Sequence, residues 1–229
     1  MTTPKKTARI AGLLYLAVVL TGIFSLAYVP SKLIVWDNLT ATYNNIKAAE
    51  SLFRFGIVAG LSCYLFFFFL VLRLYKLFEP VDKGNAKTMA ILAILSVPVY
   101  FLNAQNQFNV LSLITDTNLG LSLEQTKSQV MLYLNQYDNG MRMVHIFSGL
   151  WLFPFGYLVY KSGFLPKFFG VLLMMGCFGY LINFLGNTLV SDYSSLGISK
   201  YISMPATIGE IGICLWLLAF GVKEKQSDR

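Results

Sequence analysis

Residues 53–74 read FRFGIVAGLSCYLFFFFLVLRL, and the only charged side chains in this stretch are Arg54 and Arg73. A helix needs about 20 mostly apolar residues to cross the ~30 Å of hydrocarbon in a bilayer. A strand of a transmembrane β-barrel would alternate apolar and polar residues, and residues 65–72 do not alternate. Backbone groups inside a bilayer must pair within their own segment, so this stretch predicts a transmembrane helix.

The rest of the chain repeats this composition. Of its 229 residues, 56% are hydrophobic and only 13% are charged, whereas an average soluble domain is about 25% charged. The sequence predicts an all-α polytopic transmembrane helix bundle in which residues 1–229 form a single domain. Its six spans are expected at residues 10–29, 53–74, 88–114, 141–160, 168–190 and 203–222.

The basic residues predict the orientation of these spans. Twelve of the 18 Lys and Arg residues fall on one side of the six-span arrangement and six on the other. Cytoplasmic loops carry the excess of Lys and Arg, so both termini are expected in the cytoplasm, and the protein in the cell (inner) membrane. The richer side holds Lys5, Lys6, Arg9, Arg73, Lys76, Lys83, Lys87, Lys161, Lys167, Lys223, Lys225 and Arg229.

Composition also limits the classes of partner. The net charge of +7 does not indicate nucleic-acid binding, because the charges flank apolar runs and form no basic stripe. Cys63, Cys177 and Cys214 lie inside apolar runs, where they are expected to act as small buried hydrophobic residues. His145 is the single histidine, so we expect neither a metal site nor a cofactor. The first run is expected to remain as a span and not to be cleaved as a signal peptide.

Two external connections are predicted to be long, at residues 30–52 and 115–140. Each could contain a short interfacial helix. Ser122 is a suitable N-cap and Gln125 stands three residues later, which is the spacing of a capping box. Long connections in compact bundles often carry function or cover a site.

Polar residues inside the spans gather at one depth. Glu210 is the clearest case, because an ionisable residue inside a span costs about 2.5–3.5 kcal/mol on insertion scales. At a rise of about 1.5 Å per residue, Glu210, His145, Asn103 and Asn183 all lie about 18–22 Å from the cytoplasmic ends. The candidate ligand-binding residues in this outer half are Glu210, Arg142, His145, Arg54, Asn103, Gln107, Asn183 and Asn187.

No basic residue lies within one helical turn of Glu210. We therefore predict that Glu210 pairs with Arg142 or Arg54 across helices. The functional interpretation is a polar pocket that binds a small molecule or lipid, for transport or sensing. The alternatives are a structural network of helix contacts, an intramembrane enzyme acting on a lipid, and an assembly partner of another membrane protein. Enzyme motifs are absent from the sequence, which disfavours catalysis.

Several stretches resemble a known family. These are TARIAGLLYL at residues 7–16, LYKLFEPV at residues 74–81 and SGFLPKFFGVL at residues 162–172. They resemble the bacterial membrane family DUF4386, a domain of unknown function, over nearly the whole chain. The resemblance implies a six-span inner-membrane protein. It implies no activity and no catalytic residues.

Overall fold

The structure is a computed structural model that describes residues 4–116 and 120–222. Within these ranges every regular element is helical, which confirms the all-α prediction. Most are α-helices, while η1 is a π-helix and η2 a 3-10 helix. In chain order they are α1 (Pro4–Gly22), η1 (Ile23–Tyr28), α2 (Val29–Leu33), α3 (Leu39–Ala48), α4 (Glu50–Phe78), α5 (Lys83–Thr115), α6 (Leu123–Leu150), α7 (Leu152–Ser162), α8 (Lys167–Leu189), η2 (Tyr193–Leu196) and α9 (Ile198–Ala219).

Six helical stretches are long and apolar enough to cross a membrane, so the predicted number of spans is confirmed. The first joins α1, η1 and α2 into one rod of 30 residues. Three more are α4, α5 and α8. The fourth span combines α6 with α7, and the sixth is the part of α9 from Tyr201 to Ala219.

The fourth span differs from the prediction. Ser122 does form a capping box with Gln125, because its side chain accepts from the Gln125 amide and the Gln125 side chain accepts from the Ser122 amide. The helix that it caps, however, continues into the fourth candidate span, so residues 123–140 are helix and not a loop. Hydropathy missed this part because most of its exposed positions are polar, while Val130 and Leu134 are buried in the same cluster as Val110 of α5.

The connection between the first and second spans contains the short helix that the sequence allowed. Asn38 caps α3, and its side chain accepts a hydrogen bond of 2.9 Å from the Ala41 amide. The buried residues Thr42 and Ile46 hold α3 against the bundle. The Thr42 hydroxyl also exchanges hydrogen bonds with the amide and carbonyl of Val35. This connection is therefore a packed cap at one end of the molecule.

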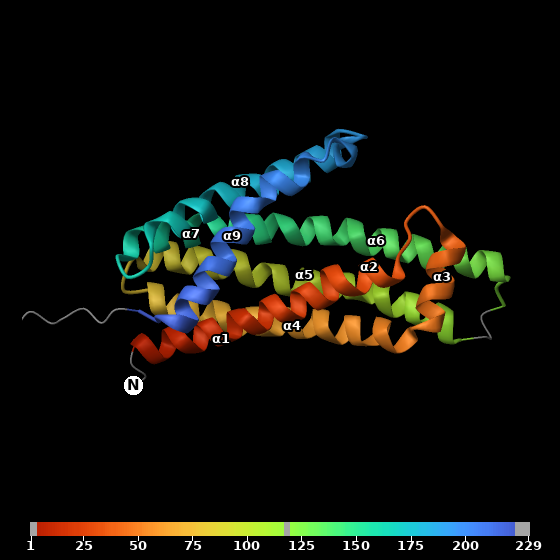
Figure 1. Cartoon of the computed structure of the whole chain (residues 1–229), viewed down its shortest axis with the longest axis horizontal. Helices are drawn as coiled ribbons and strands as arrows, with labels where there is room; N and C mark the ends of the chain where they lie inside the picture. Colours follow the sequence, from red (N-terminus) through yellow and green to blue (C-terminus); the bar gives the residue numbers. More distant parts are fainter. Residues whose placement is uncertain (1–3, 117–119, 223–229) are drawn as a thin grey trace, which may run out of the picture.

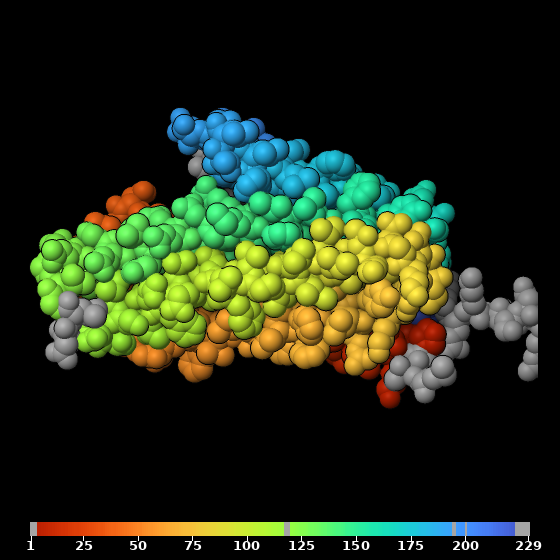
Figure 2. Space-filling view, turned by 180° about the vertical axis from the view of Figure 1, so that it is seen from behind, coloured from red at the N-terminus to blue at the C-terminus, as the bar shows by residue number. Residues whose placement is uncertain are grey.

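The helices form a long bundle with one hairpin that departs from it. In Figure 1, α4, α5 and α6 run lengthwise side by side, and α1 lies along α4. The α8–α9 hairpin crosses this bundle obliquely, and its η2 end stands away from α6. The same end projects above the packed surface of α5 and α6 in Figure 2, which views the molecule from behind. The hairpin is thus held to the bundle mainly at one end.

Close backbone contacts fix this oblique crossing. A Cβ atom added at Gly12 of α1 would lie 2.8 Å from the Leu218 nitrogen of α9, so the two helices touch backbone to backbone. A Cβ atom at Gly156 of α7 would lie 2.5 Å from the carbonyl oxygen of Gly170 in α8. Pro154 has no N–H to offer the carbonyl of Leu150, and the helix is interrupted there, at Trp151. Small residues thus bring α1, α7, α8 and α9 together at one end.

The two described ends of the chain meet at that end of the bundle. A Cβ atom at Gly221 would lie 3.5 Å from Cγ of Lys5. Nearby, the ammonium group of Lys161 in α7 donates to Asp82, the residue that caps α5, at 2.9 Å. This hydrogen bond, together with that from the Asn85 amide, lowers the pKa of Asp82 to about 2. The two ends share one side, as an even number of spans requires.

Candidate functional site

A cavity of about 330 Å³ lies where the hairpin leaves the bundle. Its walls come from α1, η1, α4, α6, α8 and α9, together with Trp151 between α6 and α7. Most of the wall is apolar or aromatic, including Phe67 and Tyr64 of α4. The lining residues come from the central part of the candidate membrane spans. The cavity therefore lies about midway along the spans.

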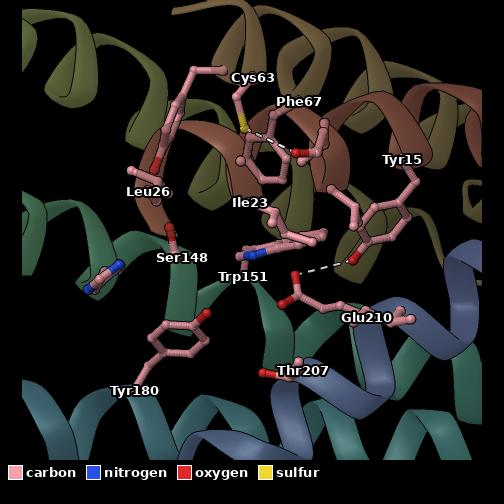
Figure 3. A pocket seen from close by; sticks show the side chains of 16 residues that line it. Tyr15, Ile23, Leu26, Cys63, Phe67, Ser148, Trp151, Tyr180, Thr207 and Glu210 are labelled. Atoms are coloured by element: carbon pink, nitrogen blue, oxygen red, sulfur yellow. Dashed lines mark hydrogen bonds between the residues drawn. The ribbon is translucent and has the colours of Figure 1, made fainter. Parts of the chain in front are cut away.

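Glu210 supplies the charged group of this cavity. Its carboxylate accepts a hydrogen bond of 3.2 Å from the Tyr15 hydroxyl of α1, a residue that is only 2% exposed. Figure 3 shows the Glu210 carboxyl group and the Tyr180 hydroxyl pointing toward the space that the labelled side chains enclose. Beside Glu210, a Cβ atom at Gly209 would lie 3.1 Å from the Leu173 side chain of α8. Leu173 of α8 therefore packs closely against α9 at this glycine.

The predicted pair between Glu210 and an arginine is wrong. Arg54 bonds Glu50 at 2.6 Å, and Arg142 bonds Asp138 at 3.1 Å. Each acid precedes its arginine by four residues, so both pairs form along one helix face. Within residues 4–116 and 120–222, Glu210 makes no ion pair within 4.0 Å.

His145 is the second predicted site residue in the cavity. Its ring centre lies 5.6 Å from that of Tyr180, and Ser148 lines the same cavity one turn further along α6. His145 and Leu26 also line a second cavity of about 290 Å³, together with Trp36 and Asp138. The two cavities therefore adjoin at this pair of side chains.

The α5 amides Asn103 and Gln107 do not line the cavity. Asn103 of α5 donates to the Tyr137 carbonyl of α6 at 2.9 Å. A Cβ atom at Gly140 would collide with the Asn103 side chain, so the two helices touch at this point. Gln107 is buried one turn further along α5, and its Oε1 atom has no hydrogen-bond partner among the residues described. Asn103 therefore ties α5 to α6.

The other two amides lie in α8, where Asn183 bonds α9 and Asn187 bonds its own helix. Asn183 donates to the Ser199 carbonyl at 3.1 Å and to the Ser203 hydroxyl at 2.7 Å, and it accepts from Tyr193 at 2.8 Å. Asn187 donates to the Asn183 carbonyl at 2.7 Å. Of the eight predicted site residues, the cavity brings together Glu210 and His145, while the other six lie elsewhere.

One wall of the cavity is the π-helix η1. The Val29 amide donates to the Phe24 carbonyl, five residues earlier, which is the π-helical pattern. The next residue, Pro30, has no N–H and cannot continue the ladder. Ile23 and Leu26 of η1 face the cavity. Short π-helical segments occur frequently at functional sites.

The sequence interpretation missed several lining residues, among them Tyr15, Tyr180 and Thr207. Tyr15 carried one usable signal, a hydroxyl in the middle of an apolar run that needs a partner when it is buried.

Cys63 donates to the Val18 carbonyl at 3.4 Å, and all three cysteines are free and buried as predicted.

Comparison with known proteins places the chain in a family. A family profile described as "Domain of unknown function (DUF4386)" matches residues 10–221. The chain belongs to this family. This DUF4386 protein is 37% identical over 79 residues to an uncharacterised protein of Archaeoglobus fulgidus. The alignment covers 34% of this chain and 44% of the relative, so it spans less than half of the relative's length. No solved structure matches this DUF4386 protein. The family assigns neither an activity nor a site residue.

Proposed function

We propose that this multi-pass membrane protein binds a small molecule or lipid in the cavity around Glu210, as part of transport or sensing. The observation that carries the proposal is a carboxylate inside a membrane span that opens on a cavity and has Tyr15 as its hydrogen-bond donor. Ionisable residues in spans are costly and usually mark functional sites. A bound ligand would supply a further polar partner to the carboxylate, beside Tyr15.

The cavity is large enough for this role. Ligand sites commonly measure roughly 300–1,000 Å³ and combine apolar walls with a few polar groups. The volume of about 330 Å³ falls at the lower end of that range. The polar groups are those of Glu210, Tyr15, Tyr180, His145 and Ser148. Asn103 and Asn183, by contrast, bond neighbouring helices and account for the architectural role of the polar residues.

An intramembrane enzyme acting on a lipid is the second candidate. His145 and Ser148 line the same cavity, and a base next to a hydroxyl is the arrangement of a nucleophilic site. No hydrogen bond joins these two side chains in the described part of the chain. Ligand binding without chemistry therefore ranks first.

We also propose that the end of the bundle where Lys5 meets Gly221 faces the cytoplasm, because the basic residues favour that side.

Two threonines provide a matched test of ligand binding. Thr207 lines the cavity, whereas Thr188 of α8 does not. Both side chains are exposed, and each hydroxyl donates to the carbonyl four residues earlier on its own helix. Thr207→Phe places a bulky group at the cavity, while Thr188→Phe makes the same change on an exposed surface of α8 outside the cavity.

The full chain is purified in mild detergent and analysed by native mass spectrometry, with enough activation to strip loosely held lipid. The wild type and Thr188→Phe are expected to retain a bound molecule of defined mass. Thr207→Phe is expected to retain about tenfold less, a loss of roughly 1.4 kcal/mol of binding free energy. Equal retention by all three proteins, or no bound molecule on the wild type, would contradict the proposal.

A further inference from the structure

The rim of the cavity lies in the hydrocarbon region. Ile23 and Leu26 of η1 are 56% and 40% exposed, and Ile211 of α9 is 38% exposed, although all three line the cavity. The first two belong to the span from Pro4 to Leu33, and Ile211 belongs to the span from Tyr201 to Ala219. The rim is therefore apolar and set within the spans. An opening bordered in this way meets lipid chains before it meets water.

The arrangement of helices explains why the cavity opens there. On one side α9 is packed on α8, since Cβ atoms at Gly176 and Gly179 would lie 2.7 Å or less from atoms of α9. On the other side, the close contacts of α9 with α1 are at Gly12 and at Tyr15, which bonds Glu210. Beyond Tyr15 the two helices diverge, as Figure 1 shows. The gap between η1 and α9 leads to the carboxylate.

The polar groups inside favour one class of head group. The Glu210 carboxylate is an acceptor, and the lining residues include neither lysine nor arginine. A hydroxyl or ammonium head can donate a hydrogen bond to a carboxylate, and such charge-assisted bonds are strong. An anionic head would find no lysine or arginine among the described lining residues, and the ionised form of Glu210 would repel it.

The volume limits how much of a ligand can be enclosed. One water occupies about 30 Å³ of liquid. The cavity of about 330 Å³ therefore has room for roughly ten groups of that size. This suits a small head and the first part of one chain, with the remainder of the chain extending into the bilayer through the gap.

We infer that the ligand is a single-chain amphiphile with a hydroxyl or amino head, which enters from the bilayer between η1 and α9 and donates a hydrogen bond to Glu210. This inference rests on the proposed function, because it names the ligand class of the same cavity. It also assigns Glu210 as the residue that selects the head group. The aromatic residues Phe67 and Trp151 contact the chain next to the head.

Trp151 can serve as an intrinsic fluorescence probe of the cavity, because it lines the cavity and is 1% exposed. The other two tryptophans, Trp36 and Trp216, do not line it. The full chain carrying Trp36→Phe and Trp216→Phe is placed in lipid nanodiscs. It is then titrated with three probes of equal chain length that carry bromine near the head: a fatty alcohol, a fatty amine and a fatty acid. Quenching of Trp151 fluorescence reports a chain inside the cavity.

The alcohol and the amine are expected to quench in a saturable manner, and the acid about tenfold more weakly or worse, as the loss of one charge-assisted hydrogen bond implies. Glu210→Gln is expected to bring the amine and the acid within about threefold of each other. Thr207→Phe should abolish saturable quenching and Thr188→Phe should not. Equal affinity for the amine and the acid in the parent protein would overturn the inference.

The two proposals fail in different ways. If native mass spectrometry finds a bound molecule that Thr207→Phe loses, but none of the three probes quenches Trp151 saturably, the ligand class is wrong and the binding function stands. If neither experiment finds a ligand, both proposals fall. Saturable quenching that is unchanged by Thr207→Phe would also overturn the inferred route.

Discussion

Replacing Glu210 with glutamine is the most informative single change in this protein. The change in the free energy of unfolding has opposite signs for the two possible partners of Glu210, a buried arginine or Tyr15. If the carboxylate were paired with a buried arginine, Glu210→Gln would strand a cation and cost about 3–5 kcal/mol. The structure has Tyr15 as the partner, at 3.2 Å. Glutamine keeps a side-chain oxygen that can accept from Tyr15 and removes the charge.

The magnitude follows from two opposing terms. An acidic residue at the centre of a span costs about 2.5–3.5 kcal/mol, and we take roughly 2 kcal/mol here because the Glu210 side chain is half-buried beside a cavity. Exchanging a charged acceptor for a neutral one weakens the Tyr15 hydrogen bond by about 1 kcal/mol. The net expectation is that Glu210→Gln raises the free energy of unfolding by about 1 kcal/mol.

The assay is reversible unfolding of the full chain in mixed micelles, titrated with a denaturing detergent at neutral pH and followed by circular dichroism. Glu50→Gln is the matched control, because Glu50 pairs with Arg54 while both side chains are well exposed. Such a surface pair is worth about 0–1 kcal/mol. If Glu210→Gln lowered the free energy of unfolding by about 3 kcal/mol or more, Tyr15 would not be the partner and a buried ion pair would be indicated instead.

Three further changes test other parts of the structure. Gly12→Ala forces α1 and α9 apart at the Leu218 backbone, and we expect a loss of about 1–3 kcal/mol by the same unfolding assay; an unchanged midpoint would contradict the close crossing. Ser122→Ala removes the capping box and should cost about 1 kcal/mol, with faster amide exchange confined to the first turn of α6; exchange that spreads through α6 would count against a local role. The pKa of Asp82 is below its ordinary value of 3.8, so the stabilisation from its contacts is complete above that value and is lost as the pH falls toward about 2. Lys161→Met should remove most of this acid-dependent loss of stability, and an identical acid profile in the variant would contradict it.

Hydropathy was sufficient to predict the six spans, because each run is long and a bilayer forces backbone pairing within it. It failed at residues 123–140, where the helix is amphipathic and its buried side chains, such as Val130 and Leu134, are spaced by a helical turn among polar ones. A count of that spacing, added to the capping box at Ser122, would have extended the helix. Hydropathy alone does not detect a helix that leaves the hydrocarbon.

The candidate site was only partly predictable. Glu210 and His145 stood out because ionisable residues are rare in spans, and both line the cavity. The partner of Glu210 was missed because Tyr15 lies 195 residues away in the sequence, and only the packing of α1 on α9 brings the two together. The arginines were misassigned although each has an acid four residues earlier, a local pairing that the sequence already contains. The π-helix has no comparable sequence signal.

The central claim is that a molecule from the bilayer occupies the cavity beside Glu210. The most direct measurement is photocrosslinking of the full chain in nanodiscs with a photoreactive fatty alcohol, followed by peptide mass spectrometry. We predict adducts concentrated on the lining residues of η1 and α9, with Thr207→Phe reducing them about tenfold and Thr188→Phe leaving them unchanged. Adducts spread evenly over the lipid-facing helices, and insensitive to Thr207→Phe, would contradict the claim.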